Sequence, residues 1–212
     1  MEYGDLEYRC DPSRVALVVV DVQNDFCGPV SVTGVARDNT AMLAMCAALD
    51  QLIPAARAAD VPVIYVRTVH DRLADSPVWR SRRPVPYPYA EELCQPGTAG
   101  IDFACTPPLP GEAVVTKRRY DAFIGTDLDH LLHSMGKEAI VATGCLTDIC
   151  VETAVRHAVS LDYFVTVAAD ACASFTVEAH DQALARMGRA FGKVADSATI
   201  ASIWKQAVAI AA

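Results

Sequence analysis

An apolar run of strand length constrains the fold of this chain more than any other feature. Residues 15–22 read VALVVVDV, with the only charged residue, Asp21, at the end of the run. A strand with one solvated face alternates apolar and polar residues, whereas a strand covered on both faces does not. The run therefore predicts a strand that is buried on both sides.

Five further strand patterns follow along the chain, and helical patterns separate most of them. The predicted strands span 61–68, 112–117, 138–144, 162–170 and 192–196, and the predicted helices span 39–59, 126–135, 149–160, 177–187 and 198–210. Parallel strands need crossover connections, which helices supply. We therefore expect one α/β domain over residues 1–212, with a six-stranded, parallel, doubly wound sheet in a three-layer α/β/α arrangement.

Composition and charge argue against several classes of partner. The chain has 212 residues, a net charge of -8 and 52% hydrophobic residues, and phosphate binding needs concentrated Lys and Arg. We expect no nucleic acid partner. The polar, acidic N-terminus does not resemble a signal peptide, and no apolar run reaches membrane-spanning length. We expect no membrane partner, a cytoplasmic location, and reduced thiols for the eight cysteines, which lack CxxC spacing.

Three chemically active residues follow the predicted carboxyl ends of strands: Asp21, Lys117 and Cys150. Ligands bind beyond these ends in open α/β sheets. Thr147 or Asp148 is suited to cap the next helix, which places Cys150 in its first turn. The helix dipole there predicts a lowered pKa for the thiol, as a nucleophile requires.

Each of these residues also has an ordinary structural explanation. Asp21 is placed to accept the thiol proton and pass it to a leaving amine, but carboxylates after strands often cap loops. Lys117 would stabilise both charged partners, yet a strand-end lysine is commonly solvated. Cys150 could be a buried apolar residue, and Cys145 is expected to pack as a wall.

The loop over 69–111 and three of the histidines are further candidates for substrate or metal binding. This long segment is rich in Pro and Gly, which favours a functional loop. His130 and His133 lie three residues apart on a predicted helix, where a surface pair is the simpler interpretation. His70 opens the loop, but one histidine makes no metal site. We therefore predict no metal and no cofactor.

Three stretches carry a resemblance to a known family. They are ALVVVDVQNDFC, VVTKRRYDAFIGTDLDHLL and ATGCLTDICVETAVRHA, and they contain Asp21, Lys117 and Cys150 in that order. Over residues 14–204 the chain resembles the isochorismatase-like cysteine hydrolases. The resemblance implies a six-stranded parallel sheet, a homodimer or homotetramer, and a thiolate that attacks an amide or ureido carbonyl to form an acyl-enzyme.

The resemblance also implies details of the site. A cis peptide would join Cys145 to Leu146, and the backbone N–H groups of Leu146 and Cys150 would form the oxyanion hole. The candidate substrate-binding residues are Gln23, Phe26, His70, Arg119 and Tyr120. The side chains that could meet either an anionic substrate or a neighbouring subunit are Arg72, Trp79, Arg80 and Arg82.

Branches of the family differ at positions present here. Isochorismate-cleaving members lack the nucleophilic Cys, and nicotinamidases carry a histidine metal set where this chain has only His70. The stretch LADSPVWRSRR resembles biuret hydrolases, and KRRYDAFIGTDLD resembles ureidoacrylate amidohydrolases. N-carbamoylsarcosine amidohydrolases share the same chemistry. We predict a metal-independent amidohydrolase for a small amide or ureido compound; the alternatives are a metal-assisted nicotinamidase-type amidase, an idle binding protein and a thiol redox sensor.

Overall fold

The central layer is a six-stranded parallel sheet. The computed structural model describes residues 4–29, 37–71, 73–81 and 93–211. The strands are β1 (Val15–Val20), β2 (Val63–Thr68), β3 (Ala113–Lys117), β4 (Ala139–Cys145), β5 (Phe164–Ala173) and β6 (Lys193–Ala195), in the order β3-β2-β1-β4-β5-β6. All five pairings are parallel. This confirms the predicted doubly wound α/β sheet.

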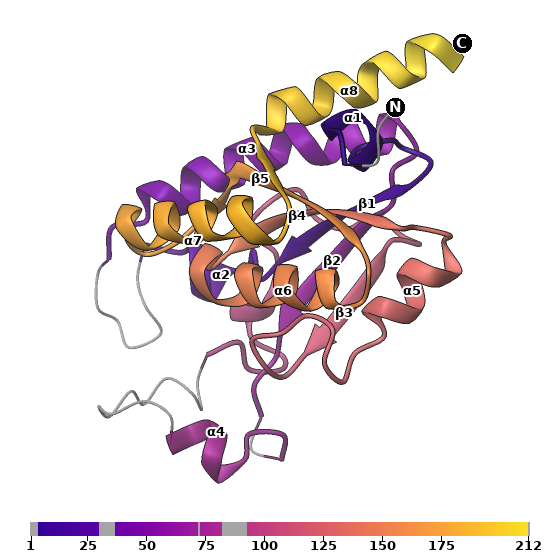
Figure 1. The fold of residues 1–212 in the computed structure, drawn as a ribbon. Helices are drawn as coiled ribbons and strands as arrows, with labels where there is room; N and C mark the ends of the chain where they lie inside the picture. The colour runs from indigo at the N-terminus through magenta and orange to yellow at the C-terminus, as the bar shows by residue number, and fades with distance from the viewer. Residues whose placement is uncertain (1–3, 30–36, 72, 82–92, 212) are drawn as a thin grey trace.

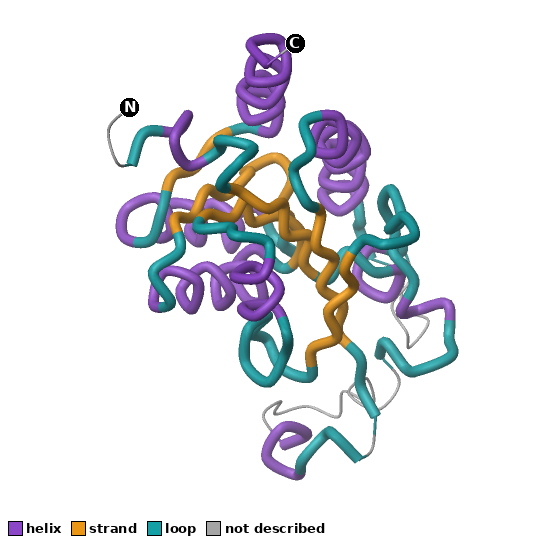
Figure 2. The backbone as a smooth tube through the Cα atoms, turned by 90° about the vertical axis from the view of Figure 1, so that its right-hand side faces the viewer, coloured by secondary structure: helices purple, strands orange, loops and turns teal. Residues whose placement is uncertain are grey.

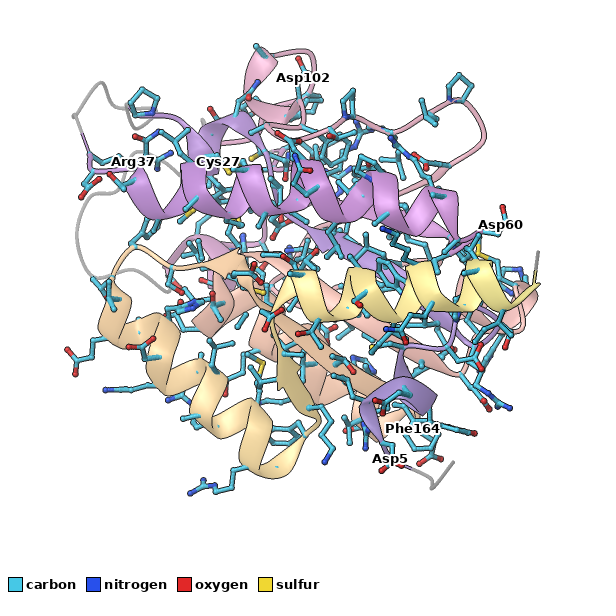
Figure 3. All side chains as sticks on the ribbon, turned by 90° about the horizontal axis from the view of Figure 1, so that it is seen from above. Asp5, Cys27, Arg37, Asp60, Asp102 and Phe164 are labelled. Atoms are coloured by element: carbon cyan, nitrogen blue, oxygen red, sulfur yellow. The ribbon has the colours of Figure 1, made fainter. Side chains whose placement is uncertain are left out.

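Helices cover both faces of the sheet (Figures 1 and 2). The longer ones are α3 (Thr40–Ala58), α5 (Leu128–Ser134), α6 (Glu152–Ser160), α7 (Val177–Ala190) and α8 (Ser197–Ala211). Buried side chains of α3 and α8 belong to one core cluster, and those of α5, α6 and α7 belong to the other. Figure 3 shows α3 and α8 side by side over the sheet.

The apolar run in β1 is explained, as predicted, by burial of the strand on both faces. Its six residues are all buried. Val15, Leu17 and Val19 contribute to the core on the α3 side, while the alternate residues of the strand contribute to the core on the opposite side. Because successive side chains point to opposite faces, a strand covered on both sides has no position left for a polar residue.

Within the part of the chain that the structure describes, one helix meets the length and composition of a membrane span, although no apolar run of the sequence was expected to do so. This helix is α3, over Thr40–Ala58. Its side chains Met42, Leu49, Leu52 and Ile53 are buried in the core cluster that covers the sheet. We interpret α3 as a core helix, because packing against the sheet accounts for its apolar residues.

The described residues contain five short elements that the sequence did not predict. They are α1 (Leu6–Arg9), α2 (Asn24–Cys27), α4 (Pro77–Ser81), a 3₁₀ helix, η2 (Ala99–Ile101), and a π-helical turn, η3 (Thr147–Val151). The predicted loop over 69–111 therefore contains α4 and η2. Both views place α4 apart from the layers around the sheet (Figures 1 and 2).

Glycine is required where β4 meets β1. Gly144 has φ +107°, and a Cβ added there would lie 2.0 Å from the backbone oxygen of Val20. This contact is between main chains, so no side chain can move to relieve it. Gly144 lets the end of β4 approach the end of β1, next to Asp21 and before the turn that carries Cys150.

Candidate active site

The fold brings three predicted side chains together at the carboxyl ends of the strands. Asp21 directly follows β1, Lys117 ends β3, and Cys150 lies in η3, after β4. The Lys117 Nζ atom lies 2.7 Å from Asp21 Oδ2 and 3.5 Å from Cys150 Sγ. All three are buried, with exposed fractions of 0%, 1% and 7% for Asp21, Lys117 and Cys150. The predicted convergence on one sheet edge is therefore present.

Thr68, which the sequence reasoning missed, connects the charged pair. Its hydroxyl accepts a hydrogen bond from Lys117 Nζ at 2.8 Å and donates one to Asp21 Oδ1 at 3.0 Å. Lys117 also donates to the backbone oxygen of Arg119 at 2.9 Å. Thr68 ends β2, which lies between β1 and β3, so its position at the same sheet edge was an available signal. These bonds fix the ammonium between carboxylate and thiol.

Asp21 itself adopts an uncommon backbone conformation. Its φ is 55°, in the left-handed region, which Asp tolerates better than most residues. Its backbone N–H still donates to Val66 of the neighbouring strand at 2.8 Å. The chain therefore turns at the last point where β1 is held by the sheet, and Asp21 is positioned by that turn.

The electrostatics of the thiol differ from the sequence prediction. Burial raises the pKa of Cys150 to about 12; the Asp21 charge adds to this effect and Lys117 opposes it. The predicted lowering of this pKa was wrong. Helix α6 begins only at Glu152, so Cys150 precedes its first turn, and burial is the largest cause of the raised pKa. Burial alone would lower the pKa of Lys117, but the Asp21 and Cys150 groups raise it overall.

The two neighbouring cysteines have different environments. Cys145 is the last residue of β4, packs in the core, and donates from its Sγ to the backbone oxygen of Asp21 at 3.0 Å. Its placement agrees with the prediction that Cys145 packs in the structure beside the site. Cys150 instead contacts the Lys117 ammonium. The peptide bond between Cys145 and Leu146 is cis, as the resemblance implied.

Two of the predicted substrate contacts have structural partners. The Gln23 side chain donates to the backbone oxygens of Thr68 at 3.0 Å and Ile101 at 3.2 Å, and accepts from the Thr68 N–H at 2.8 Å. Phe26 packs against the core cluster. Gln23 thus holds the 3₁₀ segment against the end of β2. A substrate contact for either residue stays a prediction.

The other three predicted contacts gather around Trp79 of α4. The His70 Nδ1 atom lies 3.0 Å from Asp75 Oδ2, and the His70 ring stacks on Trp79 with centroids 6.1 Å apart. The Arg119 guanidinium lies 4.8 Å from the centre of the Trp79 ring, and the Tyr120 ring is also 4.8 Å from it. The sequence reasoning did not identify Asp75, which is buried beside His70.

The remaining basic candidates of this region are only partly described. Arg80 is exposed on α4, whereas Arg72 and Arg82 lie outside the described residues. The two histidines of α5, His130 and His133, were expected to be a surface pair, and the His133 side chain is exposed and lies 3.9 Å from Asp129. Among the described residues, no group of three or more His, Cys, Asp or Glu side chains is arranged to hold a metal ion.

Comparison with known proteins identifies the family. The isochorismatase domain matches residues 15–199. The chain is 32% identical over 209 residues to ureidoacrylate amidohydrolase RutB of Methylobacterium radiotolerans, covering 91% of this chain and 80% of the relative. The chain belongs to the isochorismatase family, as the resemblance implied.

Solved structures agree with this assignment. A cysteine hydrolase from Pseudomonas syringae pv. phaseolicola 1448A has a TM-score of 0.84 and 25% identity, with 98% of this chain and 99% of that chain covered. N-carbamoylsarcosine amidase from Thermoplasma acidophilum has a TM-score of 0.69 and 28% identity, with coverage of 87% and 96%. The chain is therefore a hydrolase of the isochorismatase family with amidohydrolase relatives.

Proposed function

We propose that this chain is a cysteine amidohydrolase that cleaves the C–N bond of an amide or ureido group in a small molecule. The observation that carries the proposal is the buried contact set of Lys117 with Asp21 at 2.7 Å and with Cys150 at 3.5 Å. A nucleophile, a base and an ammonium in hydrogen-bond reach are the parts that covalent acyl transfer requires.

The raised thiol pKa determines how the reaction begins. The buried Asp21 carboxylate and Lys117 ammonium balance each other, so ionising Cys150 alone would add an uncompensated negative charge. Moving the Cys150 proton onto Asp21 as the sulfur attacks the carbonyl carbon avoids this. The negative charge then moves to the carbonyl oxygen, which the N–H groups of Leu146 and Cys150 are proposed to bind.

The second half of the cycle returns each group to its starting state. Asp21 gives its proton to the departing nitrogen, so ammonia or an amine leaves and the acyl group stays on Cys150. Asp21 then accepts a proton from water as the water oxygen attacks the acyl carbon. Asp21 returns this proton to the sulfur as the C–S bond breaks, so the thiol is regenerated and the acid product leaves. Lys117 keeps its proton throughout, and the neighbouring Asp21 and Cys150 groups raise its pKa.

Ureido and carbamoyl compounds are the proposed substrate class. Two relatives are named for such compounds, ureidoacrylate amidohydrolase and N-carbamoylsarcosine amidase. The Arg119 guanidinium and the rings of His70 and Tyr120 gather around Trp79 and could contact such a substrate. They lie beside the proposed catalytic residues, because the backbone oxygen of Arg119 accepts a hydrogen bond from Lys117. Our proposal keeps Gln23, Phe26, His70, Arg119 and Tyr120 as substrate contacts, and includes one domain over 1–212, a homo-oligomer and a cytoplasmic location.

A substrate panel with a chelator tests the proposal. We expect ammonia release from at least one of ureidoacrylate, biuret or an N-carbamoyl amino acid, with an unchanged rate after dialysis against EDTA. The described donor groups offer no metal cluster, which is why metal independence is expected. The measurement is coupled ammonia detection, with nicotinamide and simple amides in the same panel.

Two other results would favour the alternatives. Turnover of nicotinamide that is lost with EDTA, together with stoichiometric zinc or iron in the purified protein, would support a metal-assisted amidase. Saturable binding of a panel compound by calorimetry without any product would support a binding protein. Either result would overturn the proposed metal-independent hydrolysis.

A further inference from the structure

We propose that α7 is a clasp that holds the turn carrying Cys150 on both sides of the nucleophile, with His180 and Arg186 as positioning residues. This inference rests on the proposed function, since it assigns these residues to the alignment of the reacting sulfur. Neither side chain contacts Cys150, Lys117 or Asp21 in the contacts described above; each acts through a residue of the turn or its continuation.

The first contact lies before the nucleophile. Thr147 opens η3, three residues ahead of Cys150, and its hydroxyl lies 2.9 Å from His180 Nδ1. Thr147 is fully buried, and a buried hydroxyl needs a hydrogen-bond partner. His180 is fixed in turn, because its backbone N–H donates to Thr176 at 3.2 Å in the first turn of α7. The bond therefore attaches the start of the turn to a rigid helix.

The second contact lies after the nucleophile. Glu152, two residues beyond Cys150, accepts from Arg186 Nε at 3.1 Å and from Arg186 Nη2 at 2.8 Å, one bond on each carboxylate oxygen. Glu152 is buried, and the hydrogen bond from Arg186 is the largest cause that lowers its pKa. A two-point guanidinium–carboxylate pair fixes direction as well as distance. Arg156 also binds Glu152, but it lies on the same helix.

The difference between the two arginines defines a control. Arg156 is four residues from Glu152 within α6, so their bond cannot position α6 relative to another element. Arg186 belongs to α7, so its bond does. A third contact from the segment before α7 supports this side of the turn: the Ser174 hydroxyl donates to Asp148 at 2.6 Å. The turn is thus attached to the β5–α7 region at residues that flank Cys150.

The position of the sulfur is sensitive to this attachment. Lys117 Nζ contacts Asp21 at 2.7 Å but Cys150 Sγ at 3.5 Å. Lys117 belongs to β3 and Asp21 directly follows β1, whereas Cys150 lies in the turn η3, five residues beyond the end of β4. A misplacement of about 1 Å from a distant change can cost roughly 100-fold in rate. Loosening the clasp should therefore reduce the chemical step and leave substrate binding nearly unchanged.

Paired substitutions test the clasp. We expect His180→Leu and Arg186→Gln to lower kcat about 10- to 100-fold with KM within about twofold. His180→Asn keeps a polar group near the Nδ1 position and should recover most of the loss. Arg156→Gln is the matched control and should change kcat by less than about threefold, because the Arg156 side chain is exposed and its bond with Glu152 stays within α6.

A second readout does not depend on turnover. Cys150 is almost fully buried, so release of the turn should raise its rate of alkylation by iodoacetamide, followed by mass spectrometry of the Cys150 peptide. We expect a several-fold increase in His180→Leu and Arg186→Gln and none in Arg156→Gln. If the unsubstituted protein hydrolyses nothing, the proposed function fails while the alkylation rates still decide the clasp.

Defined outcomes would overturn the clasp. They are equal kcat and equal alkylation rates for Arg186→Gln and Arg156→Gln, or a loss in His180→Asn as large as in His180→Leu. Thermal unfolding is measured for each variant. If His180→Leu does not fold, Thr147→Val and Thr147→Ser test the same bond from its other end, and only Thr147→Val should lose kcat.

Discussion

Cys150→Ala is expected to abolish turnover, with a loss on the order of 10⁶-fold in kcat, since removal of a nucleophile can cost this much. The reason is geometric: Cys150 is the thiol that contacts the Lys117 ammonium, at 3.5 Å. Cys145 cannot replace it, because its own thiol donates to the backbone oxygen of Asp21 and is enclosed by the core. The measurement is ammonia release with a substrate identified from the panel.

Cys145→Ala is the informative comparison for that variant. This change leaves Lys117, Asp21 and Cys150 in place and opens a small gap in the wall, so we expect a loss of no more than about tenfold. A covalent acyl adduct in rapidly quenched protein, detected by mass, should appear on the Cys150 peptide and be absent in Cys150→Ala. Turnover that survives in Cys150→Ala, or an equal loss in both variants, would contradict the assignment of the nucleophile.

The strand pattern was sufficient to place the charged pair. The run over 15–22 identified β1, and the alternation of strand and helical patterns identified a parallel sheet whose carboxyl ends share one edge. Asp21 and Lys117 follow directly from that, because residues at strand ends depend mainly on the sheet. Thr68 also lies at the carboxyl end of a strand, β2, so its position could have been used in the same way. It was missed because a threonine hydroxyl does not by itself indicate catalysis.

The thiol was harder to predict because its pKa depends on distances that a sequence does not contain. A capping residue and a following helix predicted a thiolate for Cys150, but the thiol lies in a π-helical turn beside a carboxylate and away from water. The neighbourhood of Trp79 was unpredictable for a related reason. Its contacts join α4 to residues after β3, and no periodic pattern in 69–111 indicated that pairing.

Stability should decrease steeply above about pH 9, because burial affects every thiol in the chain. All eight cysteines lie within the described residues, and all are free and buried. Their pKa values are raised in the folded protein, with burial as the leading cause in five of them and hydrogen bonds between thiols as the first cause for Cys27 and Cys46. The cysteines concerned are Cys10, Cys27, Cys46, Cys94, Cys105, Cys145, Cys150 and Cys172. For Cys145 a hydrogen bond with Cys27 lowers the pKa, but burial and neighbouring charges raise it overall.

The direction of the effect follows from proton binding in the two states. Below the ordinary thiol pKa both states keep these protons, and the full stability is present. As pH rises from about 9 the unfolded chain releases thiol protons that the folded chain retains, for example at Cys10 until about 11 and at Cys105 until about 12. The free energy of unfolding therefore falls with rising pH throughout this window.

The size of the fall is large compared with the stability of a domain. Each thiol that is protonated only in the folded state lowers the free energy of unfolding by about 1.4 kcal/mol per pH unit. Eight such thiols set an upper limit on the order of 10 kcal/mol per pH unit, comparable with a typical total of about 5–15 kcal/mol. We expect the urea midpoint, followed by circular dichroism with a reductant present, to be constant from pH 7 to 8 and to fall sharply by pH 10.

A single-thiol variant separates this cause from other alkaline effects. Cys172 is buried on β5, its pKa is raised chiefly by burial, and it contacts none of the three residues of the proposed site. Cys172→Ala should be somewhat less stable at pH 7. Its free energy of unfolding should fall less steeply with rising pH, by about 1.4 kcal/mol per pH unit, which is the contribution of one thiol. A urea midpoint that stays constant from pH 8 to 10, or an unchanged slope in Cys172→Ala, would show that the thiols ionise as readily in the folded chain as in the unfolded one.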